Sequence, residues 1–193
     1  MANLAVTYSD QGKYEEAGEL EVKVLDLHNK VLRPEHPDTL TSMANLARTY
    51  SNQGRYEEAG ELEVKVLDLH DKVLGPEHPD TLTSMAILAV TYSQQGKYEE
   101  ARELEVKVLD LCNKVLGPEH PDTLTSMANL AVTYSYQGNY EEAEELGVKV
   151  LDLRRKVLGP EHPQTLTSME NLARTYSDQG KYEEARELAV RII

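Results

Sequence analysis

The sequence contains no Phe and no Trp, and its 11 tyrosines are the only aromatic residues. Cys112 is the only cysteine, so no disulfide can form within the chain; this fits a reducing cytosol and leads us to expect a cytoplasmic protein. No run of about 18 apolar residues occurs. The N-terminus, MANLAVTYSD, lacks the basic start and apolar core of a signal peptide. We therefore expect neither a membrane-spanning helix nor a large aromatic core.

Positive charge is also scarce, because 34 acidic residues outnumber 20 Lys and Arg residues and give a formal net charge of −14. A surplus of this size repels the phosphate backbone of nucleic acids and the anionic surface of membranes. We expect no nucleic acid and no membrane among the partners.

An internal repeat dominates what is present. Methionine recurs every 42 residues, at Met1, Met43, Met85, Met127 and Met169. Each methionine opens nearly the same phrase, MANLAVTYSDQGKYEEA in the first copy and MENLARTYSDQGKYEEA in the last. A fixed period of this length is the signature of a repeat architecture. We predict a single array made of units 1–42, 43–84, 85–126 and 127–168 and a partial unit 169–193.

Each unit reads as two helices. Gly12 and its copies follow one helical run and supply the left-handed conformation that ends it. A second helix starts at Tyr14, with glutamates in its first turn, where the helix dipole favours negative charge. Two prolines then prevent the second helix from continuing. Pro37, the later of the two, is suited to be the first residue of the next helix, with His36 as its N-cap. No strand pattern appears, so the predicted class is all-α.

The apolar pattern predicts packing on two sides. In the first helix of the second unit, one side carries Leu40, Met43, Leu46, Ala47 and Tyr50. The second helix has a wider apolar arc, made of Tyr56, Ala59, Leu62, Val66, Leu67, Leu69, Val73 and Leu74. An arc this wide predicts contact with two neighbours, as in a solenoid whose repeats share one continuous core.

Polar residues interrupt this arc at two positions. Glu21, Glu63 and Glu105 occupy the first; the fourth unit has Gly147 there and the fifth has Ala189. His28, His70 and Cys112 occupy the second, where the fourth unit has Arg154. One interpretation is a half-buried glutamate bonded to a Tyr hydroxyl or a neighbouring helix. The other is a pH-sensitive Glu–His packing element. Residues seven apart on a helix are about 10.5 Å apart, which favours the first interpretation.

The sequence offers little for catalysis or metal binding. Nearly every residue recurs in each unit, and the few unique ones do not form a nucleophile–base set. There is no GxxxxGK[ST] loop, no GxGxxG after a strand and no HExxH. The loop histidines occur once per unit, too far apart to share an ion, and we interpret them as caps: His36, His78, His120 and His162. We expect no enzyme activity, cofactor or metal, and an incidental Cys112.

The spacing of Met43, Leu46, Ala47 and Tyr50, followed by Gly54, Tyr56 and Ala59, resembles the tetratricopeptide signature. The 42-residue period, the phrase QG-x-Y-x-EA and the GPEHPD loop are similar to the longer repeats of kinesin light chains. Nearly identical copies also resemble C-terminal arrays of fungal and bacterial NOD-like receptors. Two departures are Met in place of the family's opening Trp and Glu63 in place of its second-helix aromatic. The resemblance implies an α-solenoid that forms a right-handed superhelix.

The resemblance also implies a concave groove, lined by the first helices, that binds extended peptides. On those helices the third, sixth and tenth residues of each unit lie within a 60° sector opposite the buried side. Asparagines at the third position would form a ladder that Ile87 interrupts, and Arg48 and Arg174 would attract acidic side chains or a C-terminal carboxylate. The predicted groove residues are Asn3, Val6, Asp10, Asn45, Arg48, Asn52, Ile87, Val90, Gln94, Asn129, Val132, Tyr136, Asn171, Arg174 and Asp178.

Two functional hypotheses follow. The first is a non-catalytic scaffold that binds a protein or peptide in this groove, as a fragment of a larger receptor or adaptor. The alternative is a structural module that assembles head to tail, because the ends of near-identical repeats are complementary to one another.

Overall fold

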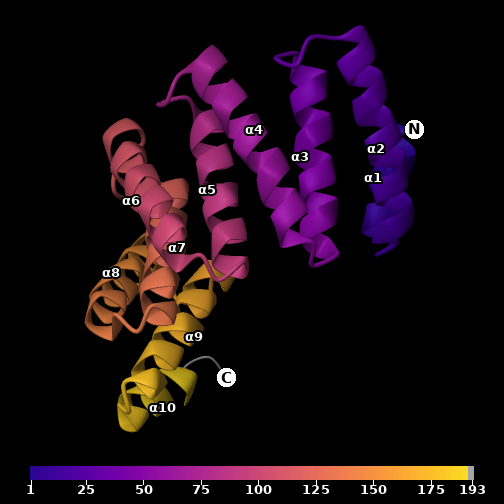
Figure 1. The fold of residues 1–193 in the computed structure, drawn as a ribbon. Helices are drawn as coiled ribbons and strands as arrows, with labels where there is room; N and C mark the ends of the chain where they lie inside the picture. Colours follow the sequence, from indigo (N-terminus) through magenta and orange to yellow (C-terminus); the bar gives the residue numbers. More distant parts are fainter. Residues whose placement is uncertain (191–193) are drawn as a thin grey trace. The chain divides into compact units, whose positions relative to one another are not determined.

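A computed structural model of the chain describes residues 1–190. This part of the chain consists of ten helices and no strand, so the all-α prediction is confirmed (Figure 1). The first helices of the repeats are α1 (Ala2–Asp10), α3 (Pro37–Asn52), α5 (Pro79–Gln94), α7 (Pro121–Tyr136) and α9 (Pro163–Asp178). The second helices are α2 (Tyr14–Val31), α4 (Tyr56–Leu74), α6 (Tyr98–Val115), α8 (Tyr140–Leu158) and α10 (Tyr182–Val190).

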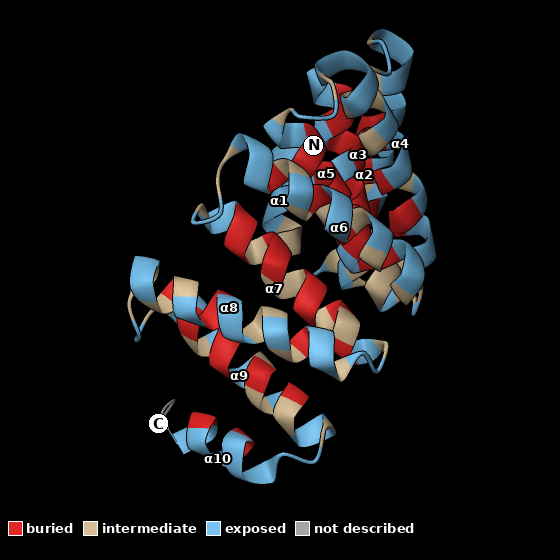
Figure 2. Ribbon diagram, turned by 90° about the vertical axis from the view of Figure 1, so that its left-hand side faces the viewer, coloured by how far each residue is buried: buried red, intermediate tan, exposed pale blue. Residues whose placement is uncertain are grey.

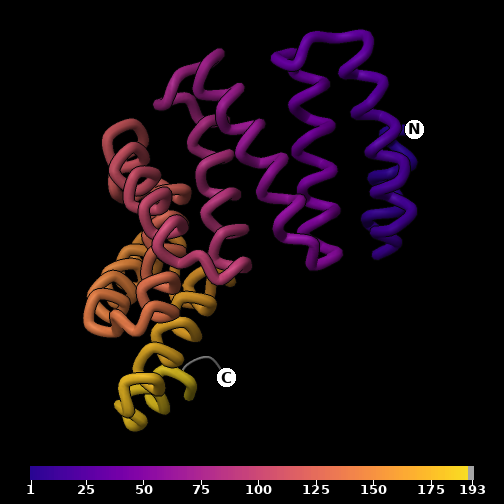
Figure 3. The backbone as a smooth tube through the Cα atoms, in the orientation of Figure 1, coloured from indigo at the N-terminus to yellow at the C-terminus, as the bar shows by residue number. Residues whose placement is uncertain are grey.

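The helices fall into two compact units. The first, Met1–Lys97, holds α1 to α5, and the second begins at Tyr98 and holds α6 to α10. Within each unit, each helix packs against the next one along the chain, and the backbone tube shows this simple succession (Figure 3). Within the two compact units, α3, α7 and α9 therefore each lie between the preceding second helix and their own second helix, as predicted for a solenoid.

Two small clusters show how consecutive helices share the core. In the first unit, Leu25 of α2, Met43 and Leu46 of α3 and Val66 of α4 are buried together. In the second unit, the corresponding cluster contains Leu151 of α8, Met169 and Leu172 of α9 and Leu188 of α10. Buried positions recur along α7 and α9 (Figure 2). Aliphatic side chains thus fill the core of a chain that has no Phe or Trp.

One part of the predicted apolar arc is wrong. Val73 and Leu74 are 53% and 40% exposed, although both were expected to face neighbouring helices. They occupy the last turn of α4, next to a loop in which Pro76 and Glu77 are exposed. The helical pattern alone therefore predicts a buried arc that runs further along α4 than the structure shows.

The predicted starts of α3, α5, α7 and α9 are confirmed. Pro37 and its copies are the first helical residues, and His36 and its copies are the N-caps. The backbone N–H of Asp38 donates to Nδ1 of His36 at 3.1 Å. The same bond recurs at 3.2 Å in the three following repeats, at His78, His120 and His162. These imidazoles accept an amide hydrogen that would otherwise lack a partner in the helix.

The predicted ends of the first helices are confirmed as well, since the glycines that follow them have positive φ, for example +74° at Gly54. A second glycine follows the second helix. Gly75 has φ +88° and ψ 165°, a conformation that is essentially restricted to glycine. The first repeat has Arg33 at this place, and among residues 1–190 every positive φ belongs to a glycine. The first repeat therefore passes this point with a different backbone conformation.

We predict that Gly75→Ala lowers the free energy of unfolding by about 1–3 kcal/mol, because the alanine Cβ strains this conformation. The matched control is Arg33→Ala, which we expect to change the free energy by less than about 0.5 kcal/mol. Urea denaturation followed by circular dichroism measures both. Equal effects of the two substitutions would contradict the assignment of strain to position 75.

Candidate functional site

The predicted groove residues lie on the first helices, and all fifteen are exposed or half-buried. Asn45, Asn129 and Asn171 are half-buried, whereas the positions at the ends of the helices, such as Asn52 and Tyr136, are exposed. The opposite side of the same helices carries the buried methionines, leucines and alanines. Each first helix thus presents a face that its own unit does not cover.

In the first unit this face combines apolar and polar groups. Ile87 and Val90 of α5 are exposed large apolar side chains. On α3, Nη2 of Arg48 donates to Oδ1 of Asn45 at 3.3 Å. Part of the hydrogen-bonding capacity of Arg48 is therefore used within its own helix.

The second unit brings together three side chains from three helices. The rings of Tyr98, which begins α6, and Tyr136, which ends α7, are stacked with centroids 5.4 Å apart and planes inclined by 19°. The Cζ atom of Arg174 on α9 lies 5.5 Å from the centroid of the Tyr136 ring. A guanidinium above an aromatic ring is held by the ring quadrupole, while its N–H groups stay available to a planar acceptor.

Arg174 differs from Arg48 in its polar contacts. Within residues 1–190, no carboxylate lies within 4 Å of the Arg174 guanidinium and no side chain accepts a hydrogen bond from it. Glu170 and Asp178 lie four residues to either side on α9. Tyr136 is unique among the five copies, where the other residues at this position are Asp10, Asn52, Gln94 and Asp178. The sequence placed Tyr136 and Arg174 on one face but did not predict the stack with Tyr98.

A glutamine at the end of each first helix was missed altogether. The Nε2 atoms of Gln53, Gln95 and Gln179 donate to the backbone carbonyls of Tyr14, Tyr56 and Tyr140 at 2.6–2.7 Å. These bonds tie the end of a first helix to the start of the preceding second helix. Gln137, beside the Tyr98–Tyr136 stack, is the exception, since its buried Nε2 has no partner among the described residues. The signal in the sequence was the Gln-Gly pair that occurs in every repeat.

The three glutamates in the apolar arc are buried more deeply than predicted. Glu21, Glu63 and Glu105 are 4–6% exposed. Burial raises the pKa of each carboxyl group, and it raises the pKa of Glu105 to about 7. A threonine hydroxyl on the following first helix opposes the rise, at Thr49, Thr91 and Thr133 respectively. The glutamates therefore lie against the neighbouring first helix, as the first interpretation has it, but they are buried and not half-buried, and a threonine faces them where a tyrosine was also considered.

The Glu–His interpretation is wrong, because the histidines bond elsewhere. Nδ1 of His28 lies 2.8 Å from Oγ of Ser42 and 3.2 Å from the carbonyl oxygen of Asp38. A carbonyl only accepts, so Nδ1 of His28 carries the hydrogen. His70 repeats the contact with Ser84 at 2.8 Å. These histidines join a second helix to the next first helix.

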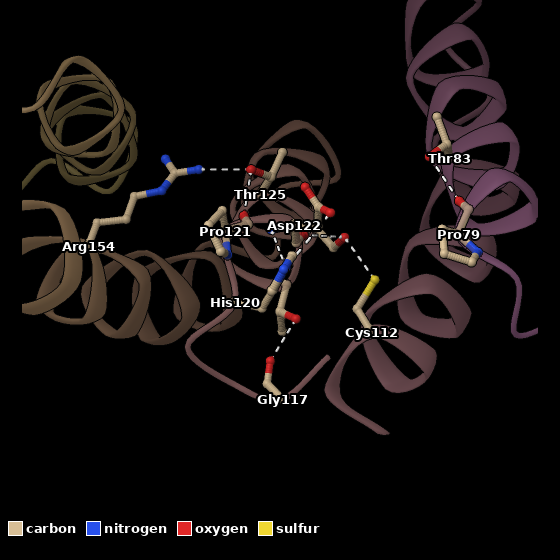
Figure 4. A network of polar contacts seen from close by, with 11 residues as sticks. Pro79, Thr83, Cys112, Gly117, His120, Pro121, Asp122, Thr125 and Arg154 are labelled. Carbon is tan, nitrogen blue, oxygen red and sulfur yellow. Dashed lines mark hydrogen bonds and ion pairs between the residues drawn. The ribbon is translucent and has the colours of Figure 1, made fainter. Parts of the chain in front are cut away.

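In the third and fourth repeats, both in the second compact unit, Cys112 and Arg154 occupy the position of these histidines. Sγ of Cys112 is 3.9 Å from Oγ of Ser126, and burial raises the pKa of its thiol, which makes it a poor nucleophile (Figure 4). Nη1 of Arg154 donates to the carbonyl oxygen of Gln164 at 3.0 Å and to Oγ of Ser168 at 2.8 Å. Nη2 of Arg154 also reaches Oγ1 of Thr125 on α7 at 3.5 Å (Figure 4).

The repeated pair of helices, the glycine-ended first helices and the shared aliphatic core agree with comparisons to known proteins. A tetratricopeptide repeat model matches residues 1–63, 106–156 and 136–193, and a second tetratricopeptide repeat model matches residues 81–122. The chain belongs to the tetratricopeptide repeat family. A search of curated proteins gave no significant match.

Solved structures place this tetratricopeptide chain among arrays of the kinesin light chain kind. It is similar to nearly identical TPR-like repeats of a putative kinesin light chain of Podosopora anserina, with 39% identity and a TM-score of 0.88. That match covers 99% of this chain and 90% of the other. BtubC (BKLC) from P. vanneervenii has 21% identity and a TM-score of 0.81 and covers 98% and 75% of the two chains. The resemblance to kinesin light chain repeats is thus confirmed.

A more distant structure is a Rap protein in complex with competence and sporulation factor. It has 15% identity and a TM-score of 0.77, and the match covers all of this chain and 52% of the Rap chain. At such identity the likeness shows the fold alone.

In residues 1–190, no helix is both long and apolar enough to cross a membrane.

Proposed function

We propose that this repeat scaffold is non-catalytic and binds an extended protein segment on the uncovered face of its first helices. The uncovered face supports the proposal, because a solenoid buries one side of each first helix and leaves the other to a ligand. The Rap protein, which shares the fold, is known in complex with competence and sporulation factor. The half-buried asparagines Asn45, Asn129 and Asn171 offer amide donors and acceptors of the kind that an extended backbone requires.

The observation that carries the proposal furthest is the contact between Arg174 and Tyr136. An arginine that is oriented by an aromatic ring and has no carboxylate partner in residues 1–190 can bind a carboxylate through two parallel N–H groups. In a chain of net charge −14, such a cation on an uncovered face favours an acidic group of the ligand at this point. We expect either an Asp or Glu side chain or a C-terminal carboxylate.

Selection of binding peptides from a displayed random library, followed by calorimetry, tests this function. We predict that Arg174→Ala lowers the affinity for the selected peptides about tenfold, which corresponds to the loss of roughly one charge-assisted hydrogen-bonded pair. The matched control is Arg48→Ala at the same repeat position, where the guanidinium already bonds Asn45 and a smaller loss is expected. Amidated peptides separate a C-terminal carboxylate from an acidic side chain.

The proposal is contradicted if no peptide is selected, or if the combined alanine variant of Asn45, Arg48, Asn129 and Arg174 binds the selected peptides unchanged. Circular dichroism of that variant verifies that the helices persist. Its four substitutions are on exposed or half-buried positions, so the fold should tolerate them.

A second candidate is head-to-tail assembly, and one observation favours it. Leu4 of α1 is 47% exposed, whereas Leu46, Leu88, Leu130 and Leu172 at the same repeat position are each 3% exposed. Leu46 is covered in part by Leu25 of the preceding second helix. A second helix of another copy would cover Leu4 in the same way. Light scattering measures the apparent molar mass. A molar mass that rises with protein concentration in the wild type but not in Leu4→Glu would support assembly, and a monomer mass at every concentration would exclude it.

A further inference from the structure

Three carboxyl groups are buried at corresponding junctions between helices. Glu21 on α2, Glu63 on α4 and Glu105 on α6 each lie at the side of a second helix that packs against the following first helix. Both carboxylate oxygens of Glu21 are buried without a hydrogen-bond partner within residues 1–190, and so is one oxygen each of Glu63 and Glu105. A buried charged oxygen without a partner is costly, whereas a protonated carboxyl group is far less so.

The threonines on the facing helices support a special arrangement at these junctions. Where no glutamate faces the threonine, its hydroxyl turns back to its own helix: Oγ1 of Thr7 donates to the carbonyl of Asn3 at 2.9 Å, and Oγ1 of Thr175 donates to that of Asn171 at 3.1 Å. Gly147 stands in the place of the glutamate opposite Thr175. Thr49 faces Glu21, and its buried hydroxyl makes no such bond in the described chain.

The charged surroundings differ from one junction to the next. Among residues 1–190, Arg48 is the cation that acts on Glu21, and it lowers the pKa of that carboxyl group against the larger effect of burial. Val90 and Val132 occupy the place of Arg48 in the next two repeats. Within residues 1–190, Glu63 and Glu105 accordingly respond to burial and to one threonine each, and to no charged side chain. The histidines seven residues further along bond serines and do not face the glutamates.

We propose that the three junctions are proton-linked: each packed junction holds a neutral carboxyl group, and loss of its proton weakens the packing of the second helix on the following first helix. The junction of α8 with α9 lacks this property because it has Gly147. This inference concerns the array itself and does not depend on any ligand.

The direction of the pH dependence follows from the raised pKa values. A group whose pKa is higher in the folded state binds its proton more tightly there, so its contribution is complete at pH values below its unfolded pKa. The contribution is lost as pH rises through the folded pKa, which for Glu105 is about 7 compared with an ordinary value of 4.5. For Glu105 alone, the folding equilibrium should fall on the order of a hundredfold between pH 5 and pH 8.

Glu105→Gln tests the proposal on the whole chain, because glutamine has the shape of the protonated carboxyl group but cannot ionise. Urea denaturation at pH 5, 6, 7 and 8 should show a variant that matches the wild type at pH 5. At pH 8 it should be more stable than the wild type, by up to about a hundredfold in the folding equilibrium. The control is Glu103→Gln, which removes an exposed carboxylate two residues away and should keep the wild-type pH profile.

The six histidines are common to all three proteins, so any effect they have cancels in the comparison. Glu105→Gln with the same pH profile as the wild type would overturn the proposal. A direct readout covers the case in which this variant folds poorly. In the wild type, the carboxyl ¹³C resonance of Glu105 should titrate near pH 7, and a midpoint near 4.5 would refute the neutral carboxyl group.

Discussion

Replacement of Arg154 by alanine is expected to lower the free energy of unfolding by about 3 kcal/mol. The side chain is 4% exposed and connects α8 to both α7 and α9. Its loss leaves a cavity where the aliphatic stem packs. It also removes the donor to the carbonyl of Gln164 and to the hydroxyls of Ser168 and Thr125. Urea denaturation at neutral pH measures the change.

The charge itself is not expected to stabilise the fold. No carboxylate lies within 4 Å of Arg154 among residues 1–190, its Nε is buried without a partner, and burial lowers the pKa of its guanidinium. Desolvation therefore opposes what packing and hydrogen bonding contribute.

Arg154→His is the matched control. His28 uses Nδ1 to contact the residue 10 positions further on and the serine 14 positions further on, which are the contacts that Nη1 of Arg154 makes. A histidine at position 154 should recover these bonds, so we expect a loss of less than about 1.5 kcal/mol. If Arg154→Ala and Arg154→His lower the free energy of unfolding equally, the hydrogen bonds at this position contribute nothing and the prediction is wrong.

The helices could be predicted because their limits are set by local chemistry. Pro37 cannot continue a preceding helix and suits the first position of the next, and the glycine after each first helix adopts a positive φ. Neither feature depends on distant residues. The spacing of Met43, Leu46 and Ala47 likewise fixes the buried side of α3, because helical geometry determines which residues share a face.

The contacts between helices could not be predicted in the same way. Glu105 lies opposite Thr133, and Tyr136 lies between Tyr98 and Arg174, because of the register at which neighbouring helices pack. That register depends on contacts between side chains about 30 to 40 residues apart. Helical periodicity relates residues within one helix and says nothing of such distant pairs. The sequence therefore identified Glu105 as unusual and Tyr136 as exposed but did not name their partners.

Leu88→Ala is expected to lower the free energy of unfolding by about 2–5 kcal/mol, the cost of deleting a well-packed leucine. Leu88 lies on α5 and is 3% exposed. The core of this chain is a thin layer of aliphatic side chains between successive helices, with no aromatic ring larger than tyrosine to fill a void. The surroundings have little freedom to collapse into the space that alanine leaves.

Leu4→Ala provides an exact counterpart, since Leu4 occupies the same repeat position on α1 but is 47% exposed. We expect this variant to lose less than about 1 kcal/mol, because little apolar area returns to water. Denaturation of both variants at low protein concentration excludes a contribution from association. Similar losses at the two positions would mean that Leu4 is covered in solution, and a loss at Leu4 that appears only at high concentration would assign the cover to a second copy of the chain.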